Sequence, residues 1–155
     1  MASILFICTG NIFRSMVAEY ALKARLGSDS GYVIGSAGIE AKPQLVHPVI
    51  RARLLEKGID VSRHVQRKLT RELLEEADLA VAMGLDHQGF VRRHFNRDVP
   101  LFNEVCHHKV EPVLDLHEAI PDWQNDHEAA RRYALSVIDH IWHSIPALLV
   151  RLPFL

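Results

Sequence analysis

A cysteine, an arginine and a serine near the N-terminus have the residue types and the spacing of a site for a tetrahedral oxyanion. In the segment CTGNIFRS, five residues separate Cys8 from Arg14, and Ser15 follows at once. Gly10 and Asn11 tolerate a left-handed backbone, which lets successive N–H groups of a short loop converge on one anion. A guanidinium can hold two oxygens of that anion, and a nearby cation favours the nucleophilic thiolate form of a cysteine. We therefore expect Cys8 as nucleophile, Arg14 as clamp, and Ser15 as a hydrogen-bond donor to the sulfur.

The flanking sequence predicts the backbone that would hold these side chains. Residues 4–7 are an apolar run of the length and β-branched content of a buried strand, and the run ends at Cys8. From Met16 onward, apolar residues such as Val17, Tyr20 and Ala21 recur at helical spacing. The resulting strand–loop–helix bend points the positive end of a helix at the loop, which suits an anion. A free cysteine is often only a buried apolar side chain, but this context favours a functional thiol.

The composition is that of one globular domain over residues 1–155. The chain has 155 residues, 48% of them hydrophobic and 24% charged, and no repeat or low-complexity stretch divides it. The formal net charge of −1 gives no general attraction to nucleic acid or to an anionic membrane, so we expect neither as a partner. An anion site in this chain must therefore be a local arrangement.

The first residues and the cysteines favour a cytoplasmic protein. The N-terminus lacks a basic segment, and its apolar run is too short for a signal peptide or a membrane span. The two cysteines, Cys8 and Cys106, make no disulfide framework, and a reducing compartment would keep Cys8 a thiol. The ten histidines show no ligand spacing that converges on a metal, so we expect no metal and no other cofactor.

The remaining periodicity predicts an α/β fold. Further strands are expected at residues 32–34, 79–83 and 99–102, and helices at 48–56, 86–95 and from Asn125 or Asp126 to near Leu149. Short right-handed connections then imply a single-domain, three-layer α/β/α arrangement with a four-stranded parallel sheet. The cysteine loop would lie at the carboxyl end of the first strand, where open α/β sheets bind ligands. Residues 111–126 are expected to form a long loop, and such loops are often functional.

The cysteine segment resembles the phosphate-binding loop of the low-molecular-weight protein tyrosine phosphatases. Further segments resemble this family in the same order along the chain, namely GSAG at 35–38, Gly58-Ile59-Asp60 with His64, residues 78–83, and Pro121-Asp122. The similarity covers nearly the whole chain. It implies a hydrolase that removes phosphate from protein phosphotyrosine through a phosphocysteine intermediate, without a cofactor.

The resemblance also assigns roles to individual residues. The residues that would bind the phosphate or line its site are Thr9, Gly10, Asn11, Ile12, Phe13 and Ser15. Asn11 would join Ser36 and His64 in a hydrogen-bonded network that holds the loop in shape. From the residues alone, Ser36 could instead begin a turn, and a lone histidine is more often structural.

Hydrolysis of a phosphate monoester also needs a carboxylic acid, which protonates the leaving oxygen and then activates the water that cleaves the phosphocysteine. Asp122 is the candidate, because Pro121-Asp122 resembles the acid-bearing loop of the family. The family has a proline after this aspartate whereas this chain has Trp123, so Asp115 and Asp126 remain alternatives. Trp123 could stack on an aromatic substrate or belong to the core.

Two loop residues bear on the substrate. In this family an apolar residue at the position of Ile12 accompanies phosphotyrosine activity and a threonine accompanies phosphoarginine activity, so Ile12 favours an aryl phosphate. Phe13 stands where many relatives have a second cysteine, which rules out a protective disulfide within the loop. The alternatives are a phosphoarginine phosphatase, an arsenate reductase, which would need relay thiols beyond Cys106, and a non-catalytic phosphate-binding module.

The expected partners follow from this activity. A phosphotyrosine-containing protein, for example a tyrosine kinase, would be the substrate. Inorganic phosphate or vanadate would occupy the loop as an inhibitor. We expect a monomer or a weak dimer.

Overall fold

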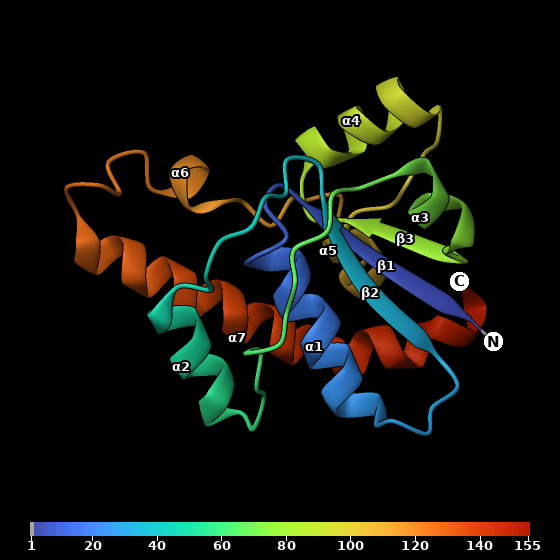
Figure 1. Ribbon diagram of the computed structural model, residues 1–155, viewed down its shortest axis with the longest axis horizontal. Helices are drawn as coiled ribbons and strands as arrows, with labels where there is room; N and C mark the ends of the chain where they lie inside the picture. The colour runs from blue at the N-terminus through green and yellow to red at the C-terminus, as the bar shows by residue number, and fades with distance from the viewer. Residues whose placement is uncertain (1) are drawn as a thin grey trace.

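A parallel β-sheet forms the centre of the molecule (Figure 1). The computed structural model describes residues 2–155, and within them three strands, β1 (Ser3–Cys8), β2 (Val33–Gly38) and β3 (Leu79–Ala82), are arranged in the order β2-β1-β3. The central strand β1 places Phe6 opposite both Ser36 and Val81. Both faces of β1 are buried, which explains why the run at residues 4–7 is apolar throughout.

The prediction of a fourth strand at residues 99–102 is wrong. Leu101 makes only an isolated parallel bridge with Ala82, in which the Ala82 N–H donates to the Pro100 carbonyl at 2.9 Å. Pro100 has no N–H to donate to a strand ladder, and the chain enters helix α5 (Phe102–His107) directly after Leu101. Within residues 2–155 the sheet therefore has three strands.

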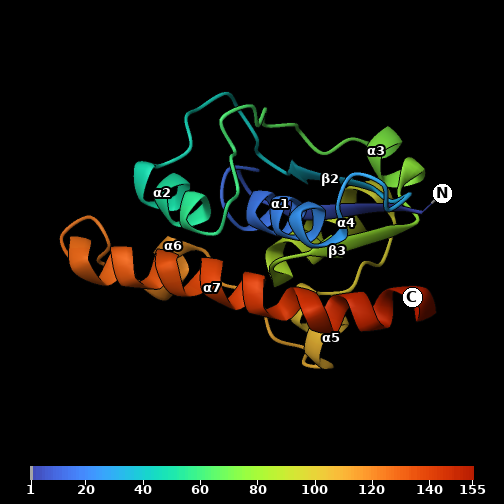
Figure 2. The same ribbon diagram turned by 90° about the horizontal axis from the view of Figure 1, so that it is seen from below.

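Helices cover both faces of the sheet (Figures 1 and 2). Besides α5, they are α1 (Arg14–Leu26), α2 (Pro48–Glu56), α3 (Arg71–Glu76), α4 (Leu85–Phe95), α6 (Leu116–Ala119), α7 (His127–Arg151) and the 3₁₀ helix η1 (Leu152–Phe154). Phe6 belongs to the core shared with α1, α5 and α7, whereas Ile7 belongs to the core shared with α3 and α4. The α/β class predicted from the sequence is confirmed.

Helix α7 crosses the molecule beneath α1 and α2 (Figure 2). Of the two predicted N-caps, Asn125 and Asp126, the helix has Asp126, whose carboxylate accepts a hydrogen bond from the Ala129 N–H at 3.0 Å. Together with η1 it is long and apolar enough, by length and composition, to cross a membrane. One face, which includes Ile138, Ile141 and Ile145, is nevertheless buried in the core. This one-sided burial is the pattern of an amphipathic core helix.

Segments from distant parts of the chain meet at the carboxyl end of the sheet. The loop of residues 9–13 joins β1 to α1, and the chain returns beside it after α5, where the Val113 N–H donates to the Met83 carbonyl at 2.8 Å. The predicted loop at 111–126 is interrupted by the short helix α6, which the acidic sequence did not indicate. This edge of the sheet therefore receives side chains from β1, α1, α4 and the α5–α7 connection.

Candidate active site

The loop of residues 9–13 leads directly into the first turn of α1. Phe13 is the N-cap residue, and its apolar side chain cannot accept hydrogen bonds from the first N–H groups of the helix. The first turn contains no acidic residue to compete for these donors, so an external anion would be favoured there. Within the loop, Asn11 is buried, whereas Ile12 and Phe13 are partly exposed.

Asn11 holds the loop in its bent form. Its backbone has φ of 55°, and its side-chain Nδ2 donates to Ser15 Oγ at 3.1 Å and to Ser36 Oγ at 2.7 Å. Its Oδ1 accepts from the Arg67 N–H at 2.9 Å, and His64 Nε2 lies 2.6 Å from its backbone carbonyl. The structure thus brings Asn11, Ser36 and His64 into one network, and Arg67 is a further member.

The network continues to a buried glutamate that the sequence did not single out. Ser36 Oγ donates to the Glu19 carboxylate, and Lys23, one helical turn further along α1, pairs with the same carboxylate. Glu19 is 7% exposed, so these donors compensate a charge that is largely removed from water. The helical spacing of Glu19 and Lys23 was visible in the sequence, but the contact with Ser36 depends on how α1 packs against β2.

Gly38, at the end of β2, permits the close approach of the loop. A Cβ atom at this position would lie 2.4 Å from the Thr9 carbonyl oxygen and 2.8 Å from the Asn11 nitrogen. The Gly38 N–H donates to the Arg67 carbonyl at 2.8 Å, so the backbone cannot easily move aside. Any side chain at position 38 would therefore push the loop away from β2.

Cys8 lies at the end of β1 with its sulfur against Ser15. The Cys8 Sγ and Ser15 Oγ atoms are 2.9 Å apart, and Cys8 is 2% exposed. The Ser15 oxygen also accepts a hydrogen bond from Asn11, and its hydroxyl hydrogen can be donated to the sulfur. A hydroxyl donor in this position stabilises a thiolate.

The Arg14 guanidinium is buried beside the loop, with 1% of the residue exposed. Its Nη1 donates to the Val113 carbonyl at 2.8 Å, and its Nη2 lies 3.3 Å from Asp115 Oδ2 and 3.4 Å from Thr9 Oγ1. The guanidinium is thus held by residues that are far apart in the sequence. A planar fork fixed in this way is preorganised for an anion with two accessible oxygens.

Asp115, one of the alternative aspartates considered above, is the carboxylate that meets Arg14. Its Oδ1 accepts from the Leu116 N–H at 2.8 Å as the N-cap of α6, and its Oδ2 faces Arg14. The Tyr133 hydroxyl on α7 donates to the carbonyl of the preceding residue, Leu114. Burial raises the pKa of Tyr133 above its usual value, so this hydroxyl stays protonated and remains a donor.

Asp122 and Trp123, chosen from the sequence, occupy different surroundings. Asp122 is exposed in a turn after α6, and its carboxylate accepts a hydrogen bond from the Asn125 side-chain amide at 2.8 Å. Asp126 caps α7, so of the three aspartates considered the structure brings only Asp115 to Arg14. Trp123 is 38% exposed and lines a pocket next to the loop.

A buried histidine from α4, which the sequence did not indicate as a site residue, also reaches the loop. His87 is 0% exposed, its Nε2 lies 2.9 Å from Thr9 Oγ1, and its Nδ1 accepts from the Gly84 N–H at 2.9 Å. Nε2 must therefore carry the hydrogen of the neutral ring and donate it to Thr9. Burial, together with the charge of Arg14, lowers the pKa of His87 to about 4, so the ring is neutral at pH 7. The available signal was its place in the first turn after β3, because the ends of parallel strands meet at one edge.

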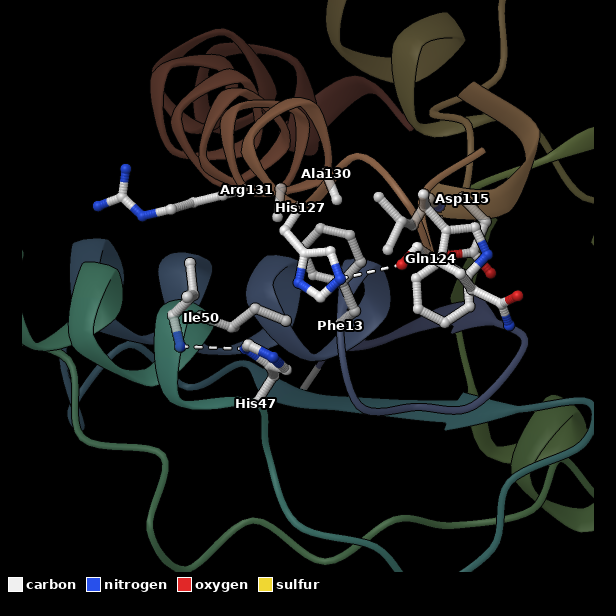
Figure 3. A pocket seen from close by; sticks show the side chains of 12 residues that line it. Phe13, His47, Ile50, Asp115, Gln124, His127, Ala130 and Arg131 are labelled. Atoms are coloured by element: carbon white, nitrogen blue, oxygen red, sulfur yellow. Dashed lines mark hydrogen bonds between the residues drawn. The ribbon is translucent and has the colours of Figure 1, made fainter. Parts of the chain in front are cut away.

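A pocket of about 570 Å³ adjoins the loop (Figure 3). Phe13, the start of α2, the connection from Asp115 to Gln124 and the first turns of α7 form its walls. Figure 3 shows His47 on the α2 side and Ala130 on the α7 side. The pocket is therefore continuous with the surroundings of the loop through Phe13 and Asp115.

The second cysteine lies in the core. Cys106, on α5, is 4% exposed, and burial raises its pKa to about 12. Its thiol stays protonated at neutral pH and is a poor nucleophile. In the part of the chain that the structure describes, no group of three or more His, Cys, Asp or Glu side chains is placed to hold a metal ion.

The sequence and the fold are similar to those of a known family. Residues 3–152 match the family described as low molecular weight phosphotyrosine protein phosphatase. This match covers nearly the whole chain, so the chain belongs to the low-molecular-weight phosphotyrosine protein phosphatase family.

Relatives in this family carry names with different activities. A protein-arginine-phosphatase of Bacillus subtilis (strain 168) is 38% identical over 96 residues, which are 61% of this chain and 63% of the relative. The low molecular weight protein-tyrosine-phosphatase Ptp of Acinetobacter johnsonii is 38% identical over 96 residues, or 59% of this chain and 63% of the relative. An arsenate reductase of Halalkalibacterium halodurans is 41% identical over 80 residues, or 52% and 55%. The aligned parts thus span less than two thirds of each of these relatives.

A solved structure is similar over nearly the full length. The arginine phosphatase YwlE, in a mutant form with a phosphorylated active-site serine, has a TM-score of 0.82 and 28% sequence identity. The similarity covers 97% of this chain and 95% of that one. The family is therefore established, whereas its members differ in substrate.

Proposed function

We propose that this protein removes the phosphoryl group from phosphotyrosine in proteins, through a phosphocysteine intermediate on Cys8. The observation that carries the proposal is the convergence of Cys8, Ser15 and Arg14 at the uncapped start of α1. Together the thiolate, the free N–H groups and the guanidinium bind a phosphoryl group and stabilise the charge of its transition state. The phosphorylated active-site serine of the YwlE mutant supports a covalent phosphoenzyme.

The proposed reaction has two displacement steps. The Cys8 sulfur attacks phosphorus, an S–P bond forms, and the P–O bond to the phenolic oxygen breaks. Water then attacks the phosphocysteine, which releases inorganic phosphate and restores the thiolate. Ser15 stabilises that thiolate before the first step and after the second, while Arg14 holds the phosphoryl oxygens throughout.

Asp115 is the general acid and base in this proposal, in place of Asp122. Its carboxylate lies 3.3 Å from Arg14, at the edge of the anion site, whereas Asp122 is in an exposed turn. A bound phosphoryl group competes with Asp115 for the Arg14 guanidinium, which frees the carboxylate to accept a proton. Asp115 then gives this proton to the leaving phenolate and takes one from the attacking water in the second step.

The walls of the site favour an aryl phosphate over phosphoarginine. Ile12 in the loop is apolar, and the adjoining pocket includes the aromatic side chains of Phe13 and Trp123. Phosphoarginine is the second candidate, because the Bacillus subtilis relative is named for that substrate. The proposal includes a phosphotyrosine protein as partner and the cytoplasm as location, where Cys8 would stay reduced.

Arsenate reduction is the less suitable chemistry for this chain. The resemblance implies that such relatives pass electrons through further thiols. Cys106 is the one other cysteine of the sequence, and it is buried in the core with a pKa raised to about 12. Such a thiol cannot act readily in exchange.

The test is hydrolysis of 4-nitrophenyl phosphate and of a phosphotyrosine peptide without added metal, by wild type and by Cys8→Ser. We expect Cys8→Ser to abolish turnover while inorganic phosphate still binds, because the N–H groups and Arg14 remain. Cys106→Ser, the matched control, should keep nearly full activity because its thiol takes no part. Turnover by Cys8→Ser would exclude the phosphocysteine route, and a higher kcat/KM for a phosphoarginine peptide would assign the second substrate class instead.

A further inference from the structure

The pocket beside the loop is large enough to hold a side chain. Its volume is about 570 Å³, which lies within the range of pockets that bind small organic ligands. Figure 3 shows the first turns of α7 on one side and the start of α2 on the other. The pocket therefore extends from the loop into the space between two helices.

The chemistry of the walls is largely apolar. Phe13, Ile50, Leu116, Trp123, Ala130 and Ala134 line the pocket. Among its lining residues, all within the described part of the chain, Asp115 alone carries a carboxylate, and that carboxylate faces Arg14. Figure 3 shows the Arg131 side chain extending outward from α7 at the rim. An apolar group can thus enter without meeting an unpaired negative charge, and burying it would be favourable.

The position of the pocket relative to the leaving oxygen indicates which part of the substrate enters the pocket. In the proposed function, Asp115 protonates the leaving oxygen, so the body of the substrate leaves the loop past Asp115. Asp115 and Phe13 are also the residues through which the pocket joins the loop surroundings. A protein substrate whose phosphotyrosine is bound in the loop therefore places its neighbouring residues at the mouth of the pocket.

We propose that this pocket binds a large apolar side chain close in sequence to the phosphotyrosine of a protein substrate. The inference rests on the proposed function and deepens it, because it names the class of phosphoprotein that the site selects. The occupant is a leucine- or phenylalanine-sized side chain, since the walls combine aliphatic and aromatic groups with one acid already paired.

The first experiment is a peptide scan with the wild-type protein. One leucine or one phenylalanine is moved through three positions on either side of phosphotyrosine in an otherwise alanine peptide. At one position kcat/KM should rise roughly tenfold over the all-alanine peptide, which is the effect expected from partial burial of such a side chain. Equal values at all positions would overturn the inference, while hydrolysis of 4-nitrophenyl phosphate would still support the proposed function.

The second experiment fills the pocket from α7. Ala130 and Ala134 are partly buried pocket residues one helical turn apart, so Ala130→Leu or Ala134→Leu occupies the space without adding charge. The preference is the ratio of kcat/KM for the best apolar peptide to kcat/KM for the all-alanine peptide. Either variant should reduce this ratio to nearly one. Ser136→Leu, at an exposed position of the same helix, is the matched control and should keep the preference.

The results of these experiments distinguish which group of the substrate occupies the pocket. A preference that persists in both filled variants, each shown to be folded by its thermal unfolding, would overturn the inference. An equal fall in kcat/KM for both peptides and for 4-nitrophenyl phosphate would show that the pocket holds the phosphorylated ring itself. That result would also overturn the inference. Failure of the wild type to hydrolyse any aryl phosphate would instead refute the proposed function.

Discussion

Each side chain that we propose to take part in the reaction has a polar neighbour. The Cys8 sulfur faces the Ser15 hydroxyl at 2.9 Å, and Arg14 faces Asp115 at 3.3 Å. The neutral ring of His87 donates to Thr9. In the proposed function, these pairs hold the nucleophile, the phosphate clamp and the acid.

The two candidate acids can be separated by the leaving group. Asp115→Asn should lower kcat by about 10²–10⁴ for aryl phosphates with poor leaving groups and much less for 4-nitrophenyl phosphate, because a good leaving group needs little protonation. Asp122→Asn, in the exposed turn, is the matched control and should leave the dependence on leaving-group pKa unchanged. A steeper dependence in Asp122→Asn than in Asp115→Asn would restore Asp122 as the acid.

His87 should make stability depend on pH. Its pKa falls from 6.5 in the unfolded chain to about 4 in the folded protein, so between these values the unfolded state binds a proton that the folded state does not. The free energy of unfolding should therefore decrease as the pH falls from about 6.5 to about 4, by up to roughly 3 kcal/mol. Urea unfolding at several pH values measures this decrease.

Two variants isolate the contribution of His87. His87→Gln keeps one donor and one acceptor but does not titrate, so its stability should fall less steeply over the same pH range. His117→Gln, at a histidine whose side chain is 66% exposed, should follow the wild type. The assignment fails if the wild type and His87→Gln lose stability in parallel.

Some elements around the site are determined by their own sequence, and others depend on contacts with distant parts of the chain. The β1–loop–α1 unit is a continuous stretch of sequence, and it forms as predicted from strand and helix periodicity. The segment with Asp115 depends on its tertiary neighbours, because the Tyr133 hydroxyl on α7 and the Met83 carbonyl after β3 hold it beside Arg14. The site therefore joins one local unit to elements from the other half of the chain.

The packing of β2 against the loop can be tested with one methyl group. Gly38→Ala would place a Cβ atom 2.4 Å from the Thr9 carbonyl oxygen, so the loop must shift. We expect a loss of stability of about 1–3 kcal/mol and a clear fall in kcat/KM for 4-nitrophenyl phosphate. Urea unfolding and steady-state kinetics measure the two effects.

Gly89→Ala on α4 is the matched control. The Cβ atom there would meet the flexible end of the Arg93 side chain at 2.9 Å, and helix propensity favours alanine by roughly 0.5–1 kcal/mol. This variant should be as stable as the wild type or more so, with unchanged activity. Equal tolerance of both substitutions would show that the loop does not need Gly38.

At the scale of the whole molecule, an anion in the loop would connect segments that are distant in the sequence. Arg14 contacts Val113, 99 positions away, and Thr9 contacts His87, 78 positions away. A ligand that binds only the folded arrangement stabilises it by mass action. Binding at the loop should therefore be visible in global unfolding.

Inorganic phosphate should raise the unfolding temperature. At 100 times its dissociation constant the stabilisation is about 2.7 kcal/mol, or roughly 5–10 °C for a domain of this size. Arg14→Lys should lose most of this shift, because a lysine cannot hold two oxygens in one plane. Arg92→Lys, at an exposed ion pair with Asp98, should keep it. A full shift in Arg14→Lys would place the anion elsewhere, and differential scanning calorimetry measures all three proteins.

The prediction of a fourth strand failed because a local pattern does not report contacts with distant parts of the chain. The apolar run at residues 99–102 looks like a strand, yet Pro100 removes a ladder donor and α5 begins at Phe102. The choice of Asp122 as the acid followed its resemblance to the acid-bearing loop of the family and stays a prediction, while the structure adds that Asp115 lies 3.3 Å from Arg14. Both features depend on contacts between distant segments, which periodicity does not report.

The sequence by itself determined the α/β class and the strand–loop–helix unit that carries Cys8, Arg14 and Ser15. These features follow from residues that are adjacent in the chain, so steric preferences and hydrophobic periodicity are enough to predict them. Only the tertiary structure decided that Asp115 meets Arg14, that His87 supports Thr9, and that an apolar pocket opens beside them. The reason is physical, because each of these contacts joins side chains many residues apart and exists only once the helices have packed on the sheet.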